Sequence, residues 1–265
     1  MNPRRVPATS TDASGRRVVV VGASSGIGAA IAGAAIAAGA EVVLSARRPD
    51  KLAELVAEHG GGHVIAADAT DPDEVRALLD AAAAHLGGID LVVYVAGAGL
   101  VQPLAEIEPQ RWLDIFDVNV IGANLVAGAA LDHLEDDGII AFISSRTVDD
   151  VNAHFAAYSA TKAALDQCIA TWRVEHPSRR FVRVVMGNAQ PTEFADHMGD
   201  PKAVGVALSR WIEQGINVST MMNTDDVGAA LVAALTAALD HPNIDSSELR
   251  FDARTPHPAA PEGNQ

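Results

Sequence analysis

Short β-prone apolar runs alternate along the chain with longer segments rich in alanine and leucine, and this alternation limits the possible folds most strongly. Apolar runs without polar interruptions predict strands that are buried on both faces. When such strands alternate with helices, they are typical of a parallel sheet covered by helices on both sides. We therefore expect an α/β fold with a doubly wound parallel sheet of about seven strands. The expected strands are residues 17–21, 41–45, 63–67, 91–95, 138–144, 181–186 and 248–251, and the expected helices are residues 26–38, 49–59, 72–86, 109–133, 156–175 and 224–239.

The domain organisation predicted from the sequence is simple. No internal repeat, heptad pattern or linker-like break divides the chain, so a single domain of residues 16–254 fits best. Residues 1–15 and 255–265 are rich in Pro, Ser, Thr and Gly and are expected to be flexible tails. Thr224 is expected to cap the last helix at its N-terminus, where acidic residues follow it.

The composition limits the partners and the compartment. A formal charge of −15 over 265 residues argues against nucleic acid or an anionic membrane surface as a partner. The single cysteine, Cys168, excludes an internal disulfide and fits a reducing compartment, and its neighbours suggest a small core residue. The longest apolar run, residues 29–40, is too short to span a membrane, and the N-terminus lacks the apolar core of a signal peptide. A cytoplasmic protein is expected.

A glycine-rich loop follows the first expected strand directly. Glycines at this place let the backbone turn tightly and approach a pyrophosphate, whose charge meets the N–H groups of the next helix. The spacing is Gly-xxx-Gly-x-Gly, unlike the Gly-x-Gly-xx-Gly of the most familiar dinucleotide fingerprint. The loop predicts nucleotide binding, and the alternative is a tight strand–helix turn without a ligand. The expected contacts are Gly22, Ser24, Ser25, Gly26, Ile27 and Gly28.

Two arginines follow the second expected strand, where NAD-specific sites usually have a carboxylate for the ribose 2′-hydroxyl. The chain has no carboxylate in Ser45-Ala46-Arg47-Arg48. A guanidinium suits a phosphate through its charge and its planar fork of donors. We therefore expect Arg47 and Arg48 to favour NADP(H) over NAD(H). The alternative is that both arginines are solvated charges at the start of the next helix.

Tyr158 and Lys162 are spaced by one helical turn, so their side chains are expected on the same face of a helix. An ammonium beside a phenol favours the phenolate, so Lys162 is expected to lower the pKa of Tyr158 from about 10. Tyr158 would then be a general acid/base near neutral pH. Taken alone, a pair at this spacing is more often a feature of a helix surface.

Taken together and in this order, the motifs resemble those of a short-chain dehydrogenase/reductase of the single-domain type. The resemblance covers about residues 16–255 and rests on several motifs at once. It implies a Rossmann-type fold and a homodimer or homotetramer packed through the long helices at residues 109–133 and 156–175. The matching motifs are the Gly22/Gly26/Gly28 loop, Asp68 in Ala67-Asp68-Ala69-Thr70, Ala96-Gly97, Asn119 in Asp117-Val-Asn119-Val, and Ser145, Tyr158 and Lys162.

The resemblance implies a catalytic role for four residues. Tyr158 would give a proton to a substrate carbonyl, or take one from an alcohol. Ser145 would bind and polarise the substrate oxygen, and Lys162 would hold the nicotinamide ribose. Asn119 would help to hold a water that links Lys162 to solvent, although a helix kink or a satisfied core amide would also explain it. Hydride chemistry would belong to the cofactor.

The resemblance also implies further contacts with the cofactor. Asp68 would lie beside the adenine, although a turn or a helix cap would also explain this residue. The implied cofactor contacts beyond the glycine loop and the arginines are Asp68, Ala69, Ala96, Gly97, Tyr158, Lys162, Gly187 and Thr192.

Three segments depart from the family pattern. Val21 stands where the family commonly has Thr. Tyr94-Val95-Ala96-Gly97 replaces Asn-Asn-Ala-Gly, so we expect altered local hydrogen bonds rather than lost catalysis. Met186-Gly187 replaces Pro-Gly, and the expected Thr is displaced by one residue, with Pro191 in its usual place. Thr192 is the candidate for contact with the nicotinamide carboxamide.

Residues 193–223 would form a flap over the substrate in this family. An apolar lid and ordinary packing helices are equally good interpretations of this stretch. His154 lies four residues before Tyr158, where it could face the cleft, but an exposed loop position is the preferred interpretation. The histidines show no metal-ligand spacing, so no metal is expected. The flap residues that suggest a lid are Phe194, His197, Met198, Trp211, Met221 and Met222.

The expected function is an oxidoreductase that transfers a hydride between NADP(H) and a small carbonyl or alcohol substrate. The first alternative is a non-catalytic NADP(H)-responsive regulator on the same fold, which would have no need of a proton donor. The second is a sugar-nucleotide epimerase or dehydratase, which shares the Tyr/Lys pair. Those relatives usually have Gly-xx-Gly-xx-Gly and a longer C-terminal domain, and this chain has neither.

Overall fold

The computed structural model describes residues 11–254 except residues 195, 197 and 217. Apart from residues 11–15, the two predicted tails therefore lie outside the described residues. Seven strands form one sheet in the order β3-β2-β1-β4-β5-β6-β9, and every neighbouring pair is parallel. This confirms the predicted doubly wound sheet. The strands are β1 (Arg17–Val21), β2 (Glu41–Ser45), β3 (His63–Val64), β4 (Ile89–Tyr94), β5 (Leu134–Ser145), β6 (Arg180–Met186) and β9 (Glu248–Phe251).

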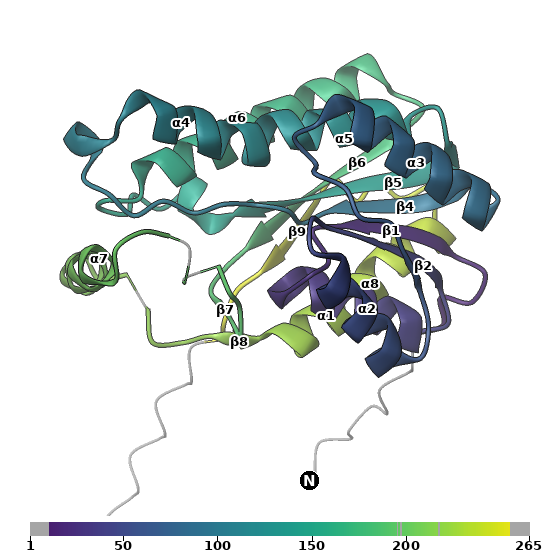
Figure 1. Ribbon diagram of the computed structural model, residues 1–265, viewed down its shortest axis with the longest axis horizontal. Coiled ribbons are helices and arrows are strands. Elements are labelled where there is room, and N and C mark those ends of the chain that lie inside the picture. The colour runs from purple at the N-terminus through teal and green to yellow at the C-terminus, as the bar shows by residue number, and fades with distance from the viewer. Residues whose placement is uncertain (1–10, 195, 197, 217, 255–265) are drawn as a thin grey trace, which may run out of the picture.

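Helices cover both faces of the sheet, as Figure 1 shows. One face packs on α1 (Gly26–Ala37), α2 (Pro49–His59) and α8 (Thr224–Asp240), and the opposite face packs on α3 (Pro72–Leu86), α5 (Ala123–Ala130) and α6 (Ala156–Glu175). Because successive strand residues point to opposite faces, the alternate valines of β1 enter different cores. Four of the five β1 residues are buried, which explains the continuous apolar run in the sequence.

Strand β3 is shorter than predicted. The ladder with β2 is regular only at His63 and Val64. Beyond it, Ile65 N still donates to Leu44 O at 3.1 Å, and Ala67 N donates to Ala46 O at 3.2 Å. The chain therefore stays extended beside β2 until the turn at Asp68. This segment has the apolar sequence pattern of a strand but only part of the hydrogen-bond ladder.

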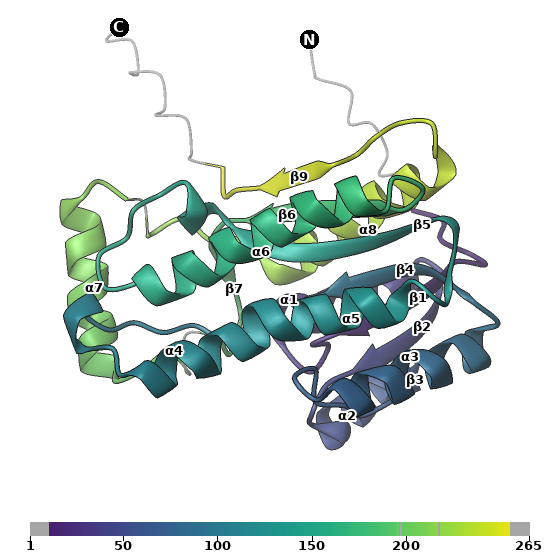
Figure 2. The same cartoon turned by 90° about the horizontal axis from the view of Figure 1, so that it is seen from above.

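The long helix predicted at residues 109–133 is interrupted. It consists of α4 (Pro109–Phe116), the π-helical segment η2 (Asp117–Gly122) and α5. By length and composition alone, the stretch Pro109–Ala130 could cross a membrane, a possibility that the sequence prediction had missed. A core helix meets the same criteria, and this stretch packs against α3 and α6 along the sheet (Figure 2).

The described part of the flap region contains helix α7 (Pro201–Glu213) and one strand of a small two-stranded sheet. Helix α7 lies beyond the carboxyl ends of the strands, and β7 (Ala189–Gln190) pairs with β8 (Met222–Asn223) (Figure 1). The predicted cap of α8 is wrong by one residue. Asn223, rather than Thr224, is the N-cap, because its side chain accepts hydrogen bonds from the two N–H groups of the first turn.

Replacing Gly228 by alanine is expected to destabilise the protein, because α1 and α8 touch at this glycine. A Cβ there would lie 2.5 Å from Ala30 O and 2.6 Å from Ala30 C, so one helix must shift. Overpacking of this kind lowers the free energy of unfolding by about 1–3 kcal/mol. Urea denaturation measures the loss.

The matched control for this variant is Gly205→Ala. Gly205 is also helical, in α7, but a Cβ at this position meets no atom within 4 Å. This control should be neutral or stabilising by up to about 1 kcal/mol, because alanine has the higher helix propensity. Equal shifts in the two variants would contradict the close contact between the helices.

Candidate active site

The glycine loop connects β1 to α1 at the carboxyl edge of the sheet (Figure 1). Gly22 and Gly26 have φ angles of 96° and 53°, which side chains disfavour. A Cβ on Gly28 would lie 2.1 Å from Gly22 O, so the first turn of α1 closes directly on the loop. These glycines therefore form the tight, bare turn that a dinucleotide pyrophosphate needs, beside unpaired N–H groups of α1. Between the glycines lie the half-buried residues Ser24, Ser25 and Ile27.

The two predicted arginines have different surroundings. Arg48 reaches back to the glycine loop, with Nη2 at 2.8 Å from Ser24 Oγ and 3.2 Å from Ser25 Oγ. Arg47 is exposed, and no carboxylate lies between the end of β2 at Ser45 and Asp50 in the first turn of α2. The prediction missed Lys51, a third cation beside them, although its spacing from Arg48 places both on one face of α2.

Asp68 forms the turn that follows the extended segment beside β2. Its carboxylate accepts hydrogen bonds from Thr70 N at 3.0 Å and Thr70 Oγ1 at 2.8 Å. Partial burial opposes ionisation, but these hydrogen bonds and the charge of Arg47 hold the pKa of Asp68 below its ordinary value. Ala69 is buried after it. The turn is thus confirmed, whereas contact with adenine stays a prediction.

Tyr94 stabilises the π-helical interruption of the long helix. Its hydroxyl donates to Val118 O at 2.6 Å, so it pairs a carbonyl inside η2. Burial raises the pKa of Tyr94, and the phenol therefore stays a donor. Tyr94 thus has a hydrogen bond of its own at the place where the chain departs from the family pattern, and the expected difference from the family's bonds stays a prediction. It fixes the segment that carries Asn119.

Asn119 joins three parts of the site. Its side chain is 0% exposed, and Oδ1 accepts from Ala98 N at 2.8 Å. Nδ2 donates to Ala98 O at 2.9 Å and to Thr161 Oγ1 at 2.9 Å. Thr161 Oγ1 in turn donates to the carbonyl of Tyr158 at 2.7 Å. Asn119 is therefore a satisfied amide that connects the loop after β4 to α6, and its part in holding a water stays a prediction.

Residues 95–97 connect the glycine loop to Asn119 and Lys162. Ala96 N donates to Val21 O at 3.0 Å, and a Cβ on Gly22 would lie 2.4 Å from Ala96 N. A Cβ on Gly97 would lie 3.3 Å from Asn119 Oδ1 and 3.7 Å from Lys162 Nζ. Ala96 and Gly97 thus lie between the glycine loop and Lys162, and their contact with a cofactor stays a prediction.

Tyr158, Lys162 and Ser145 come together at the carboxyl end of β5. Ser145 is the last residue of that strand, and its Oγ accepts from Thr147 N at 3.2 Å and from Thr147 Oγ1 at 3.0 Å. Lys162 Nζ donates to Ile143 O at 2.8 Å and lies 5.8 Å from the centre of the Tyr158 ring. Both side chains on α6 are buried, with Tyr158 8% and Lys162 3% exposed.

The structure reverses the predicted direction of the pKa shift for Tyr158. Burial raises the pKa of Tyr158 to about 12, and a hydrogen bond with Ser145 only partly opposes this rise. Burial also lowers the pKa of Lys162 to about 8, so the ammonium carries a desolvation penalty. The prediction of a lowered phenol pKa is therefore wrong for this arrangement, because loss of water outweighs the nearby ammonium.

A half-buried acid lies one turn beyond Lys162. Asp166 pairs with Arg183 of β6 at 2.7 Å between Oδ2 and Nη2. Burial raises the pKa of this carboxyl, against the opposing interactions with Ser144 and Arg183 and the charges of Arg183 and Lys162. Its charge in turn opposes the lowering of the Lys162 pKa. The prediction stopped at Lys162 and missed this third member of the same helix face.

The segment after β6 folds back over the glycine loop. Gly187 N donates to Phe251 O at 2.8 Å, which places this glycine at the end of β9. A Cβ on Gly26 would lie 3.2 Å from Cβ of Thr192, so Thr192 rests on the nucleotide loop. Glu193 follows and pairs with Arg48 and Lys51. Contact of Thr192 with a carboxamide stays a prediction.

An apolar cluster surrounds Tyr158 and supports the lid interpretation of the flap. The Tyr158 ring stacks on Phe155, with centroids 4.5 Å apart, and meets the edge of Phe194 at 5.3 Å. Trp211 of α7 lies 5.3 Å from Phe155 and donates from Nε1 to Ala153 O at 2.6 Å. Helix α7 therefore packs on the same apolar cluster as Tyr158, and its role as a lid stays a prediction. His197 lies outside the described residues.

Two smaller predictions concern histidine and metal. His154 is half-buried rather than exposed and has a φ of 64°. Its backbone carbonyl accepts from Gln102 N at 2.8 Å, which ties it to the loop after β4. Among residues 11–254, apart from the three positions not described, no cluster of His, Cys, Asp and Glu could hold a metal ion.

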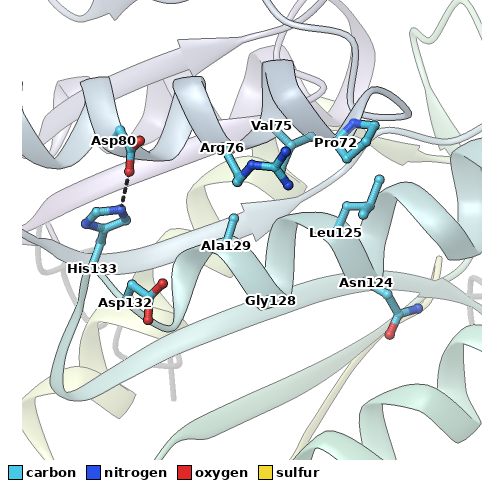
Figure 3. A pocket seen from close by; sticks show the side chains of 10 residues that line it. All are labelled: Pro72, Val75, Arg76, Asp80, Asn124, Leu125, Gly128, Ala129, Asp132 and His133. Carbon is cyan, nitrogen blue, oxygen red and sulfur yellow. Dashed lines mark hydrogen bonds and ion pairs between the residues drawn. The ribbon is translucent and has the colours of Figure 1, made fainter.

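A groove of about 360 Å³ lies elsewhere, between α3 and α5 (Figure 3). A contact of 2.8 Å between His133 Nε2 and Asp80 Oδ1 crosses one end of it. None of the predicted site residues lines this groove. We therefore place the candidate active site at Tyr158 and not in this groove.

Comparisons with known proteins agree with the geometry. The family model described as short chain dehydrogenase matches residues 16–203. An uncharacterized oxidoreductase of Methylorubrum extorquens is 38% identical over 157 residues, 57% of this chain and 63% of that protein, so the match spans less than two thirds of its length. A 3beta-hydroxysteroid dehydrogenase 1 of Eggerthella lenta is 33% identical over 214 residues, 77% of this chain and 82% of that protein.

A solved structure extends the likeness over almost the whole fold. The short chain dehydrogenase of Burkholderia cenocepacia in complex with NADP superposes with a TM-score of 0.74 at 28% identity, covering 90% of this chain and 97% of that one. The sheet order, the glycine loop and the grouping of Ser145, Tyr158 and Lys162 fit the same assignment. The chain therefore belongs to the short chain dehydrogenase family of oxidoreductases.

Proposed function

We propose that the protein is an NADP(H)-dependent oxidoreductase that interconverts a ketone or aldehyde with an alcohol, with Tyr158 as general acid/base. One observation carries the proposal: Tyr158 and Lys162 lie buried on one face of α6 and are joined to a bare glycine loop through residues 95–97. The loop keeps its tight, bare turn because a Cβ at Gly22 or Gly28 would meet backbone atoms, and a turn of this kind suits the pyrophosphate of a dinucleotide. The bound cofactor would supply the hydride.

The remaining residues would orient the substrate and hold the proton. Tyr158, whose burial raises its pKa to about 12, is a protonated donor at neutral pH and suits carbonyl reduction. Ser145 ends β5 beside it and would hold the substrate oxygen. Lys162 would bind the nicotinamide ribose, while Asn119 fixes the backbone of Tyr158 through Thr161. The apolar wall of Phe155, Phe194 and Trp211 would exclude water and favour an apolar substrate.

Preference for NADP(H) rests on the cations beside the loop. Arg47, Arg48 and Lys51 surround the end of β2, and the carboxylate that would bind a ribose 2′-hydroxyl is absent from Ser45 to Arg48. The Burkholderia relative is described in complex with NADP, which is consistent with this preference.

Replacing Arg47 by glutamine is expected to weaken NADPH binding by about 10- to 100-fold, the effect of losing a charge-assisted hydrogen bond to phosphate. NADH binding should change by less than about threefold, because NADH lacks the phosphate. Fluorescence titration of both nucleotides measures the two effects. Arg76→Gln, at an exposed arginine of α3 paired with Asp73, is the control. Equal weakening of both nucleotides in Arg47→Gln would refute the phosphate contact.

The proposal is tested by NADPH oxidation over a panel of cyclic, aromatic and short aliphatic ketones and aldehydes. Turnover that is strongest with apolar carbonyls supports the assignment. NADPH binding without turnover over the whole panel would favour the alternative, a non-catalytic NADP(H)-responsive regulator. Transformation of a nucleotide sugar instead would favour the epimerase alternative.

The rest of the proposal concerns the setting of the enzyme. We place the protein in the cytoplasm, with a small-molecule substrate and no nucleic-acid or membrane partner. Residues 16–254 would form one catalytic domain whose flap is residues 193–223, with residues 195, 197 and 217 of that flap outside the described residues. A homodimer or homotetramer would pack through the long helices. Exposed Leu113 and Ile121 on the α4–η2 stretch offer apolar surface for such contacts.

A further inference from the structure

Glu193 occupies the cationic site that the proposed function assigns to phosphate. Its Oε2 lies 2.7 Å from Arg48 Nη1, and its Oε1 lies 2.8 Å from Lys51 Nζ. Each carboxylate oxygen thus has its own cation, as the oxygens of a phosphate would. The two cations hold the pKa of Glu193 at about 2, so the carboxylate stays charged at physiological pH.

The partners of this carboxylate connect it to the glycine loop. While Nη1 of Arg48 binds Glu193, Nη2 of the same guanidinium donates to Ser24 Oγ at 2.8 Å and to Ser25 Oγ at 3.2 Å. Thr192, the preceding residue, rests on Gly26, where a Cβ would come within 3.2 Å of the Thr192 Cβ. The chain at Thr192 and Glu193 therefore covers the loop and the cations together.

The next residue covers the catalytic tyrosine. The Phe194 ring meets the Tyr158 ring edge-on, with centroids 5.3 Å apart. Its Cζ atom lies 2.9 Å from the place of a Cβ on Gly99, so only a glycine at that position lets the ring reach so close. Two consecutive residues thus block two sites, with Glu193 on the phosphate site and Phe194 on Tyr158.

Glu193 is held there by ion pairs that a phosphate can replace. Its side chain is 33% exposed, and those of Arg48 and Lys51 are 43% and 45% exposed. Exposed ion pairs of this kind are weak. A phosphate dianion with charge-assisted hydrogen bonds to the same guanidinium and ammonium is the stronger ligand.

We propose that Glu193 is an internal anion that closes the segment at Thr192–Phe194 over both sites, and that the 2′-phosphate of NADP(H) displaces it and uncovers Tyr158. This rests on the proposed function, and it assigns a residue to cofactor selectivity. NADP(H) carries the anion that competes with Glu193, whereas NAD(H) leaves the carboxylate on its cations. The cofactor must then bind before the substrate reaches Tyr158.

The test uses 2′,5′-ADP and 5′-AMP, which differ by the 2′-phosphate alone. Isothermal titration with Glu193→Gln is expected to show tighter binding of 2′,5′-ADP by about 3- to 10-fold, the effect of removing a competing ion pair. Binding of 5′-AMP should change by less than about twofold. Glu213→Gln is the matched control, because Glu213 forms an exposed ion pair with Arg210 in the same flap.

Hydrogen–deuterium exchange of the peptide containing Thr192–Phe194 gives a second readout that needs no turnover. In the absence of nucleotide, Glu193→Gln should exchange faster than the wild type and than Glu213→Gln. Adding 2′,5′-ADP to the wild type should also speed exchange, and adding 5′-AMP should not.

The outcomes separate the two proposals. If the wild type binds NADPH but Glu193→Gln leaves 2′,5′-ADP affinity and exchange unchanged, the displacement by phosphate is refuted and the proposed function stands. Weaker 5′-AMP binding in Glu193→Gln would instead indicate that Glu193 binds the ribose hydroxyl. That result would also refute the displacement by phosphate. If neither protein binds 2′,5′-ADP, NADP(H) preference and displacement fail together.

Discussion

Replacing Tyr158 by phenylalanine is expected to lower kcat for carbonyl reduction by about 10²- to 10⁴-fold, the usual contribution of a positioned general acid. The ring would remain stacked on Phe155 and against Phe194, so the apolar wall should keep its shape. The change removes the proton that the buried phenol holds up to a pKa of about 12. Steady-state NADPH oxidation gives kcat, and fluorescence titration should show NADPH affinity within about threefold of the wild type.

The control for this variant uses the other of the two tyrosines in the chain, Tyr94. Tyr94→Phe also removes one buried hydroxyl. That hydroxyl donates to Val118 O, so it can influence the proposed reaction only through the position of Asn119. We expect at most about a tenfold loss of kcat, since one hydrogen bond contributes on the order of 1 kcal/mol. If Tyr158→Phe kept full activity, Tyr158 would not be the proton donor.

Replacing Lys162 by methionine is expected to lower activity by about 10²-fold or more and to change its pH dependence. Burial lowers the pKa of Lys162 to about 8, so the ammonium loses its charge above that pH. The wild type should then reduce carbonyls more slowly above about pH 8. Lys162→Met should show no such transition, and pH profiles of kcat for both proteins provide the measurement.

The same substitution is expected to stabilise the fold at neutral pH. The folded pKa of about 8 lies below the ordinary 10.5, so the unfolded chain binds more protons between these values. The free energy of unfolding therefore rises with pH across that window, and the full penalty of burying the ammonium is present below pH 8. A shift of this size corresponds to about 3 kcal/mol, less about 1 kcal/mol for the lost hydrogen bond to Ile143 O.

Urea denaturation at pH 7 and pH 10 checks this prediction. Lys162→Met should be more stable than the wild type by about 2 kcal/mol at pH 7, and the difference should shrink at pH 10. Lys202→Met, at an exposed lysine of α7, should leave the free energy of unfolding nearly unchanged. A less stable Lys162→Met at pH 7 would mean that its hydrogen bond and the charge of Asp166 outweigh desolvation.

Elements governed by local patterns were predictable from sequence. The apolar runs gave the bounds of β1, β2 and β9, and helices α2, α3 and α6 agree with their predicted ranges. Proline at the first turn and glycine at the end of α2 and α3 explain why these bounds are sharp. The grouping of the three candidate residues was also predictable, because Tyr158 and Lys162 share one helix and Ser145 ends a neighbouring strand, whereas their catalytic role stays a prediction.

Other features depend on contacts between distant segments. In the π-helical segment η2, the carbonyl of Val118 accepts a hydrogen bond from Tyr94, which lies 24 residues earlier in the sequence. No local sequence pattern predicts this segment. Glu193 meets Lys51 across 142 residues of sequence, so the ion pair was not predictable either. The predicted direction of the Tyr158 pKa shift was wrong for a related reason: spacing shows which charges are near, whereas desolvation depends on the distant segments that pack around the ring.

The apolar cluster around Tyr158 is separate from the two cores of the sheet. Its buried members are Leu100, Val101, Ile115, Phe155, Ala157, Tyr158, Ala207 and Trp211, none of which lies in a strand. Local opening of this cluster therefore needs no loss of the sheet. Heat would inactivate such an enzyme at a temperature where its secondary structure still persists, so that half-life of activity and unfolding temperature become two independent properties.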